Sequence, residues 1–408
     1  MRVTILTVGS RGDVEPFLAL SRGLLAAGHD PVIATLAEFE PMVTGAGIPF
    51  ALLPGNSRAV LAGPEGQALM AERNPFRLIE RMRAVIGPAL LEAHPAAEEA
   101  CAGADLVVHH TMAVFGITIA ERLGVPSVAA HLFPNSPTRE FPMVAMPSAV
   151  PAALNRLTWR IAESLPWRAF RPLLDTRRAV LGMPPLPRRP LSRWPTGAPA
   201  RLYGFSPAVV PPPADWRADD HVTGYWFTEP GAYTPPQELV DFLAAGPPPV
   251  YLGFGSASGG SPGETAELLL SAARANGLRA VLHTGWAGLS ATAEDTLTID
   301  DVPHWWLFPR VRAAVHHGGA GTTAAALRAG IPSVVVPFFA DQFFWGRQVV
   351  ELSVGAVTAT RDRVTGPELA EALRTALTRA PRARELAAEL AAEDGVATAV
   401  EVLESVVR

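Results

Sequence analysis

The first part of the chain alternates short apolar runs with segments of helical periodicity. The runs VTILTV (3–8), PVIAT (31–35), DLVVHH (105–110) and PSVAAHLF (126–133) have the length of buried strands. Between the first two, residues 14–28 carry apolar side chains at helical spacing and end on Gly28, which suits a helix C-cap. Strands that alternate with helices predict an α/β fold whose parallel sheet is covered on both faces.

A second series of the same kind follows. Its strand-like runs are PPPVYLGFGS, RAVLHTG, AAVHHGG and PSVVVPF, at 247–256, 279–285, 313–319 and 332–338. The stretch between the two series is rich in proline at 209–216 and 228–237, which predicts a linker. The last 40 or so residues favour helix. We therefore expect two α/β halves with a cleft between them, and a ligand at the carboxyl ends of the strands.

Composition narrows the function classes. The chain has 408 residues, 49% of them hydrophobic and 18% charged, so it has the material for two or three domains. The net charge is −5 with no basic block, which disfavours nucleic acid as a partner. All 34 basic residues are arginine, which excludes a P-loop or Schiff-base lysine. The chain has one cysteine, which excludes a disulfide framework. It has no uninterrupted apolar run of about 18 residues, so no membrane span is expected. We expect a cytoplasmic protein.

The segment HHGGAGTTA (316–324) predicts a strand, a bare turn and the start of a helix that ends at Gly330. Gly318, Gly319 and Gly321 carry no side chains that would block a ligand, and the first N–H groups of a helix form an anion site. A hydroxyl of Thr322 or Thr323 and the ring of His317 can add donors, which favours phosphate binding. The alternative is that the glycines only permit a tight turn.

A rival interpretation is an NAD-dependent oxidoreductase. GAGTTA (319–324) matches the dinucleotide fingerprint G-x-G-x-x-A, and Asp341 follows about 20 residues later. That fingerprint usually follows the first strand of its domain, whereas this one follows a late strand. Gln342 and Trp345 beside Asp341 favour recognition of sugar hydroxyls instead.

The loop GSRGDVEP places Ser10, Arg11, Asp13 and Glu15 at the end of the first strand. If the halves face each other, a carboxylate here could accept a proton from a nucleophile. Asp13 is also a plausible N-cap, with Pro16 in the first turn, and both roles can coexist. The chain has no G-x-S-x-G, D-x-D or H-E-x-x-H motif, so no hydrolase elbow or metal site of those types is expected.

The motifs at 9–29, 247–256 and 316–349 together resemble the family-1 inverting glycosyltransferases of the GT-B fold. The bacterial enzymes that glycosylate antibiotics are the most similar branch, and sterol glucosyltransferases are relatives. The resemblance implies two Rossmann-like domains whose parallel sheets face each other across a cleft. It implies an acceptor-binding domain (1–227), a linker (228–246), a nucleotide-sugar-binding domain (247–390) and a C-terminal helix (391–408) that returns to the first domain.

The resemblance also implies roles for individual residues. The diphosphate is expected at His317 and at the backbone of Gly319, Gly321 and Thr322, with a further contact from Ser256. The segment from Val302 to Trp305 would cover the nucleotide base, and Asp341 and Gln342 would bond sugar hydroxyls. Asp13 would be the general base, with Ser10 nearby. Many relatives have a histidine as base in the first loop, where this chain has Asp13.

The expected partners are two small molecules, a UDP or dTDP sugar and an apolar natural-product acceptor. The nucleotide sugar is a co-substrate, and we expect neither a bound metal nor a cofactor. Segments 55–100 and 135–200 match no motif, and their Pro, Leu, Met and Trp content favours a bulky apolar acceptor. A catalytically inactive binding module of the same fold is a further alternative.

Overall fold

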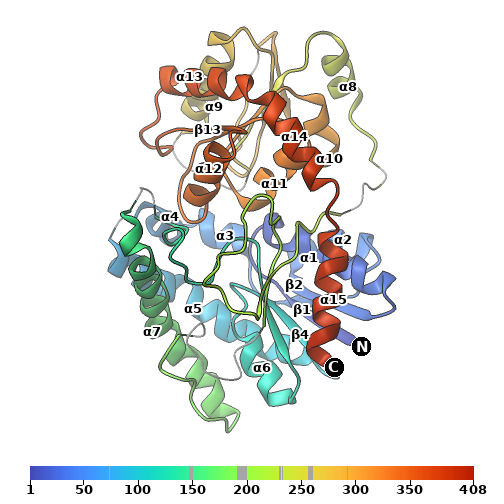
Figure 1. The fold of residues 1–408 in the computed structure, drawn as a ribbon, viewed down its shortest axis with the longest axis vertical. Helices are drawn as coiled ribbons and strands as arrows, with labels where there is room; N and C mark the ends of the chain where they lie inside the picture. The colour runs from blue at the N-terminus through green and yellow to red at the C-terminus, as the bar shows by residue number, and fades with distance from the viewer. Residues whose placement is uncertain are drawn as a thin grey trace.

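The computed structural model consists of two lobes, one above the other in Figure 1. It describes all residues except 73, 147–149, 191–199, 229–230, 232, 256–260 and 292. Each lobe contains one parallel sheet.

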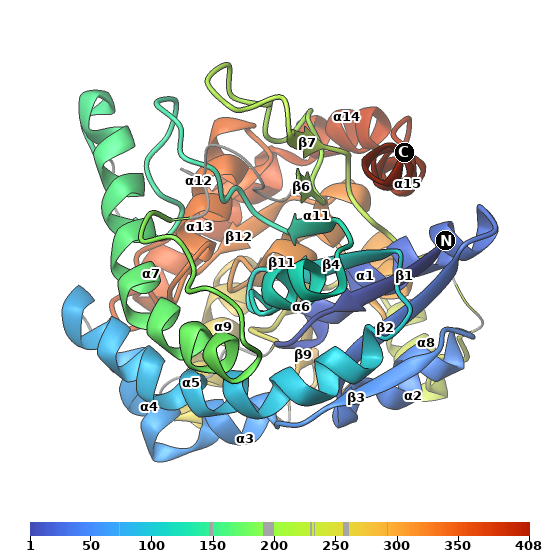
Figure 2. The same ribbon diagram turned by 90° about the horizontal axis from the view of Figure 1, so that it is seen from below.

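The first lobe is built on a seven-stranded sheet in the order β3-β2-β1-β4-β5-β6-β7. Every pairing in it is parallel, and β1 lies between β2 and β4. Its strands are β1 Arg2–Leu6, β2 Asp30–Leu36, β3 Phe50–Leu53, β4 Leu106–His110, β5 Ser127–His131, β6 Ala200–Tyr203 and β7 Asp220–Val222. Its helices are α1 Arg11–Ala26, α2 Glu40–Gly45, α3 Ser57–Ala62, α4 Pro64–Ala71, α5 Pro75–Ala100, α6 Gly116–Leu123 and α7 Asn155–Val180. Helices α5 and α7 pack against each other on the outer side of this lobe (Figure 2).

The second lobe is built on a six-stranded sheet in the order β10-β9-β8-β11-β12-β13, again parallel throughout. Its strands are β8 Val250–Leu252, β9 Ala280–His283, β10 Thr296–Ile299, β11 Ala314–His316, β12 Ser333–Val335 and β13 Gly355–Val357. Its helices are α8 Gln237–Ala244, α9 Pro262–Ala275, α10 His304–Leu307, α11 Ala320–Arg328, α12 Gln342–Glu351, α13 Gly366–Thr378 and α14 Ala380–Leu390.

The strand order reverses at one point in each sheet. In the first sheet β1 and β4 are neighbours although they are far apart in sequence, and in the second sheet the same holds for β8 and β11. Loops at the carboxyl ends of such strand pairs diverge and leave room for a ligand. The first loop (GSRGD) follows β1 and the glycine loop (HHGGAG) follows β11, so both lie at these reversal points.

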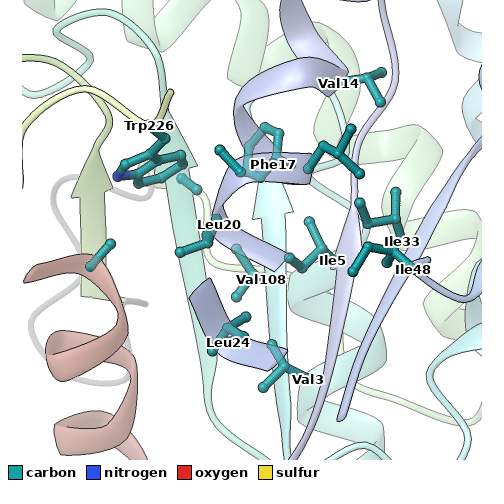
Figure 3. Close-up of a cluster of buried hydrophobic side chains, with 14 of the residues drawn as sticks. Val3, Ile5, Val14, Phe17, Leu20, Leu24, Ile33, Ile48, Val108 and Trp226 are labelled. Carbon is teal, nitrogen blue, oxygen red and sulfur yellow. The ribbon is translucent and has the colours of Figure 1, made fainter. Parts of the chain in front are cut away.

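The last helix, α15 (Gly395–Val407), returns to the first lobe and packs on α1 (Figure 1). Ala399, Val400 and Leu403 join the core formed by α1 and the first sheet, part of which is drawn in Figure 3. The approach is close, because a Cβ atom on Gly23 of α1 would collide with the side chain of Val396. His29 and Glu404 add a 3.0 Å contact between Nε2 and Oε1.

Part of the predicted linker 228–246 is a helix. Residues 237–244 form α8, and Leu239 is buried in a cluster with Tyr251 and Val281 of the second sheet. Pro235 and Pro236 stand just before this helix and Pro247 to Pro249 follow it, so they delimit the helix rather than prevent it.

Candidate active site

The first loop holds the Asp13 carboxylate in a defined position. Asp13 Oδ2 accepts hydrogen bonds from the Ser10 backbone N–H at 2.7 Å and from Ser10 Oγ at 2.9 Å. Gly9 has φ +142°, and a Cβ atom there would collide with Asp13 Oδ2, so the loop requires glycine. Ser10 is the N-cap of α1 and Asp13 is the third helical residue, so the N-cap role considered for Asp13 belongs to Ser10. The Asp13 side chain remains 32% exposed and can meet a ligand.

A histidine that the sequence analysis did not select lies next to Asp13. His110 is the last residue of β4, and its Nε2 is 3.7 Å from Asp13 Oδ1. The ring of Phe17 packs edge-on against it, with centroids 5.7 Å apart. Burial lowers the pKa of His110, and the charge of Asp13 opposes that shift. The sequence shows only that a predicted strand ends in histidine. That this strand pairs with β1, and so brings His110 to Asp13, is known only from the strand order of the sheet.

The glycine loop has an open helix terminus. Gly319 is the N-cap of α11, and the first backbone bond of the helix runs from the Thr323 N–H to the Gly319 carbonyl at 3.0 Å. The N–H groups of Ala320, Gly321 and Thr322 therefore have no acceptor within the helix. Thr323 is buried and its Oγ1 bonds the Gly319 carbonyl at 2.9 Å, which leaves Thr322 as the hydroxyl for a ligand.

His317 stands beside this terminus. Burial lowers its pKa to about 4, so the ring is neutral near pH 7 and has one N–H group that can donate a hydrogen bond. Gly318 has φ +88°, and a Cβ atom there would lie 2.6 Å from Val335 Cγ1. The backbone conformation and the packing both require glycine at this turn.

Asp341 and Gln342 begin helix α12, but they differ in what they already bind. Asp341 Oδ2 accepts the indole N–H of Trp345 at 3.0 Å. Burial, with a smaller effect from the charge of Asp13, raises the pKa of Asp341 to about 7. Gln342 is buried, and its Oε1 accepts the backbone N–H groups of Phe338 and Phe339 at 2.7 and 3.2 Å. Gln342 therefore fixes the loop that presents Asp341.

The segment from Val302 to Trp305, predicted to cover the nucleotide base, packs against apolar and aromatic side chains. Val302 is buried in a cluster with Tyr251, and His304 stacks on Phe308 with ring centroids 4.4 Å apart. Burial lowers the pKa of His304 to about 3. Trp305 is half-buried and meets the ring of Tyr233 edge-on. Ser256, predicted to contact a phosphate, lies outside the described residues.

The two loops face each other across the gap between the lobes. Helices α1 and α11 are in contact, and a Cβ atom on Gly321 would lie 3.9 Å from Gly12 Cα. Arg11 forms an ion pair with Asp301 of the opposite lobe. The charge of Asp13 also contributes to the raised pKa of Asp341, so the carboxyl groups of the two lobes are near enough to interact. The structure thus brings together Ser10, Asp13, Gly321 and Asp341 from three separate segments.

Known proteins match both lobes. Residues 3–142 match the glycosyltransferase family 28 N-terminal domain, and residues 276–407 match the erythromycin biosynthesis protein CIII-like C-terminal domain. A sterol 3-beta-glucosyltransferase of Cryptococcus neoformans var. neoformans serotype D is 36% identical over 439 residues, which covers 99% of this chain and 27% of that protein. The chain is thus similar to glycosyltransferases over both lobes, and it spans about a quarter of the length of the sterol relative.

Solved structures agree with the fold of this GT-B chain. The calicheamicin glycosyltransferase has a TM-score of 0.71 at 20% identity, covering 99% of this chain and 98% of that one. A spinosyn rhamnosyltransferase complexed with thymidine diphosphate has a TM-score of 0.67 at 19% identity, covering 99% and 100%. The expectation of two Rossmann-like domains in a GT-B arrangement is therefore confirmed.

The oxidoreductase interpretation finds no support in these comparisons. The topology also argues against a dinucleotide site, because that fingerprint normally follows the first strand of its domain. Here GAGTTA follows β11, whereas the first strand of the second sheet is β8. Within the described part of the chain, no helix has both the length and the apolar character to cross a bilayer. Nor do the described residues place three or more histidine, cysteine or carboxylate groups where they could hold a metal.

Proposed function

We propose that the chain is an inverting glycosyltransferase that moves a sugar from UDP or dTDP to a hydroxyl of an apolar acceptor, without a resident metal or cofactor. One observation carries the proposal. The partly exposed Asp13 carboxylate belongs to the loop of one lobe whose Gly12 nearly touches Gly321 at the open α11 terminus of the other lobe.

The α11 terminus would bind the donor. The free N–H groups of Gly321 and Thr322, with the neutral ring of His317, would hold the diphosphate. Negative charge develops on the diphosphate oxygens as the bond to the sugar breaks, and preorganised donors stabilise it. Loss of one such donor would raise the barrier by about 3 kcal/mol. Asp341 would then bond the sugar hydroxyls from the loop that Gln342 fixes.

Asp13 would act as the general base. The acceptor hydroxyl attacks the anomeric carbon on the face opposite the leaving diphosphate, so the configuration inverts. Asp13 takes the hydroxyl proton as the oxygen commits to attack. Ser10 holds Oδ2 through two hydrogen bonds, which fixes the direction of the carboxylate. Closure of the lobes would exclude water, which is the competing nucleophile.

The acceptor class is drawn from the relatives. The relatives named above are a sterol glucosyltransferase, a calicheamicin glycosyltransferase and a spinosyn rhamnosyltransferase, and another structure of the last is complexed with the spinosyn aglycone. We take a bulky apolar body with a hydroxyl group as the common acceptor type. We therefore propose an acceptor of that kind, either a sterol or an apolar bacterial natural product.

The test combines binding with product analysis. Thermal-shift titrations with UDP, dTDP and NAD⁺ should show stabilisation by a nucleoside diphosphate. Incubation of UDP- or dTDP-sugars with sterol and polyketide acceptors should give a glycoside whose anomeric configuration is opposite to that of the donor. Failure of both diphosphates to bind would overturn the donor site, and retained configuration would overturn the inverting mechanism.

A further inference from the structure

The proposed function leaves a buried imidazole beside Asp13 unused. The two carboxylate oxygens of Asp13 have different surroundings: Oδ2 is held by Ser10, whereas Oδ1 lies 3.7 Å from His110 Nε2. The His110 side chain is only 2% exposed, whereas that of Asp13 is 32% exposed, so Asp13 is the member of the pair that solvent or a ligand can reach.

The sheet order explains how the two residues meet. Strands β1 and β4 are paired in register, with Leu6 opposite His109, so the loop after β1 and the end of β4 leave the sheet side by side. His110 lies one residue beyond that pair, and Phe17 of α1 packs against its ring. A small movement of either side chain would close the 3.7 Å separation to a hydrogen bond.

We propose that His110 acts through Asp13 as a positioning and proton-holding residue, so that the base is the Asp13–His110 pair. This deepens the function proposed above and rests on it. In the transfer, the acceptor O–H bond breaks while its oxygen bonds the anomeric carbon, and the diphosphate leaves with the electron pair of the old bond. The proton passes through Asp13 to His110 Nε2, which leaves an imidazolium paired with a carboxylate.

The surroundings of the pair suit this role. Burial keeps His110 neutral before the reaction and lowers its pKa, while the negative charge of Asp13 favours the proton once it arrives. The other titratable groups that act on the pair are His109 and His131 from the sheet and Asp341 across the cleft. Both histidines are neutral near pH 7, because burial lowers their pKa values. A carboxylate alone is a weak base towards an alcohol, and an adjacent imidazole nitrogen offers the proton a second acceptor.

The first experiment compares His110→Gln with His109→Gln across pH. Glutamine is of similar size and has an amide that can bond Asp13 Oδ1, but it cannot hold the proton. In the His110 variant we expect kcat to fall by about 10²-fold, the acid limb of the profile to move to lower pH, and donor KM to stay unchanged. His109 is a buried neighbour on the same strand, and its variant should keep the wild-type profile. A His110 variant with the wild-type acid limb would overturn the proposal.

The second experiment needs no acceptor. NMR titration of the His110 ring in the wild type and in Asp13→Asn should show proton uptake at lower pH in the variant. An unchanged titration would show that the two groups do not share a proton, and would overturn the proposal even for an active enzyme. A changed titration in a protein that transfers no sugar would instead count against the proposed function alone.

Discussion

The carboxyl groups of Asp13 and Asp341, which come from opposite lobes, interact electrostatically across the cleft. Burial is the larger cause of the raised pKa of Asp341, about 7, and the charge of Asp13 adds to it. Near neutral pH Asp341 is therefore partly protonated. A carboxyl group that carries its proton part of the time can serve a site as a hydrogen-bond donor.

This relationship predicts a pH-dependent stability. A carboxyl group whose pKa is raised on folding costs stability above its unfolded value of 3.8, and the full cost is reached above about pH 7. Asp341→Asn keeps an acceptor for Trp345 without the charge. We expect it to raise the free energy of unfolding by roughly 1–2 kcal/mol at pH 8 and by much less near pH 4.5. Chemical denaturation at the two pH values measures this, and an equal effect at both would contradict it.

If Asp13 is the base, its substitution should lower turnover and leave donor binding nearly unchanged. Asp13→Asn should lower kcat by about 10²-fold or more, because the amide cannot take a proton. Donor affinity should change little, since the predicted phosphate donors lie on α11. Steady-state kinetics and calorimetry with UDP or dTDP give the two readouts. Wild-type turnover in the variant would remove Asp13 from the mechanism.

The α11 terminus predicts that Gly321→Ala binds donor poorly without losing stability. The nearest atom to a Cβ atom at 321 is Gly12 Cα at 3.9 Å, so the fold has room for alanine. Alanine in place of a helical glycine stabilises by up to about 1 kcal/mol. A diphosphate held by the backbone there would meet the new methyl group, so we expect at least 10-fold weaker binding of UDP or dTDP.

Gly45→Ala is the matched control for that variant. Gly45 ends α2, and a Cβ atom there meets no other atom within 4 Å. Its donor affinity should equal that of the wild type. Unchanged affinity in Gly321→Ala would place the diphosphate elsewhere.

The apolar runs predicted the inner strands well, because a buried parallel strand is apolar on both faces. The predicted strand at 126–133 is β5, and the run at 3–8 contains β1. The last two strands at one side of the first sheet, β6 and the edge strand β7, were missed, since they are short and lie in a region rich in proline and tryptophan. The helices α5 and α7 were not singled out, and each has two prolines in its interior, where proline usually argues against a helix.

The residues of the candidate site also divide into those that a local sequence pattern reveals and those that only the fold reveals. The glycine loop and the first loop could be found in the sequence because their function depends on local backbone geometry. His110 could not, because its relation to Asp13 depends on the pairing of β1 with β4, about 100 residues apart. Likewise, the bond from Thr323 to the Gly319 carbonyl, which leaves Thr322 for a ligand, required side-chain positions.

The contact between α1 and α15 predicts a compensating pair of substitutions. A methyl group on Gly23 would collide with the side chain of Val396, which joins the last helix to the first lobe. Gly23→Ala alone should lower the free energy of unfolding by about 1–3 kcal/mol, as overpacking does elsewhere. Val396→Ala makes room, so the double variant should be more stable than Gly23→Ala, with a coupling energy of at least about 1 kcal/mol. Denaturant unfolding of the four proteins measures that energy. Additive effects would mean that α15 does not pack on α1 as described.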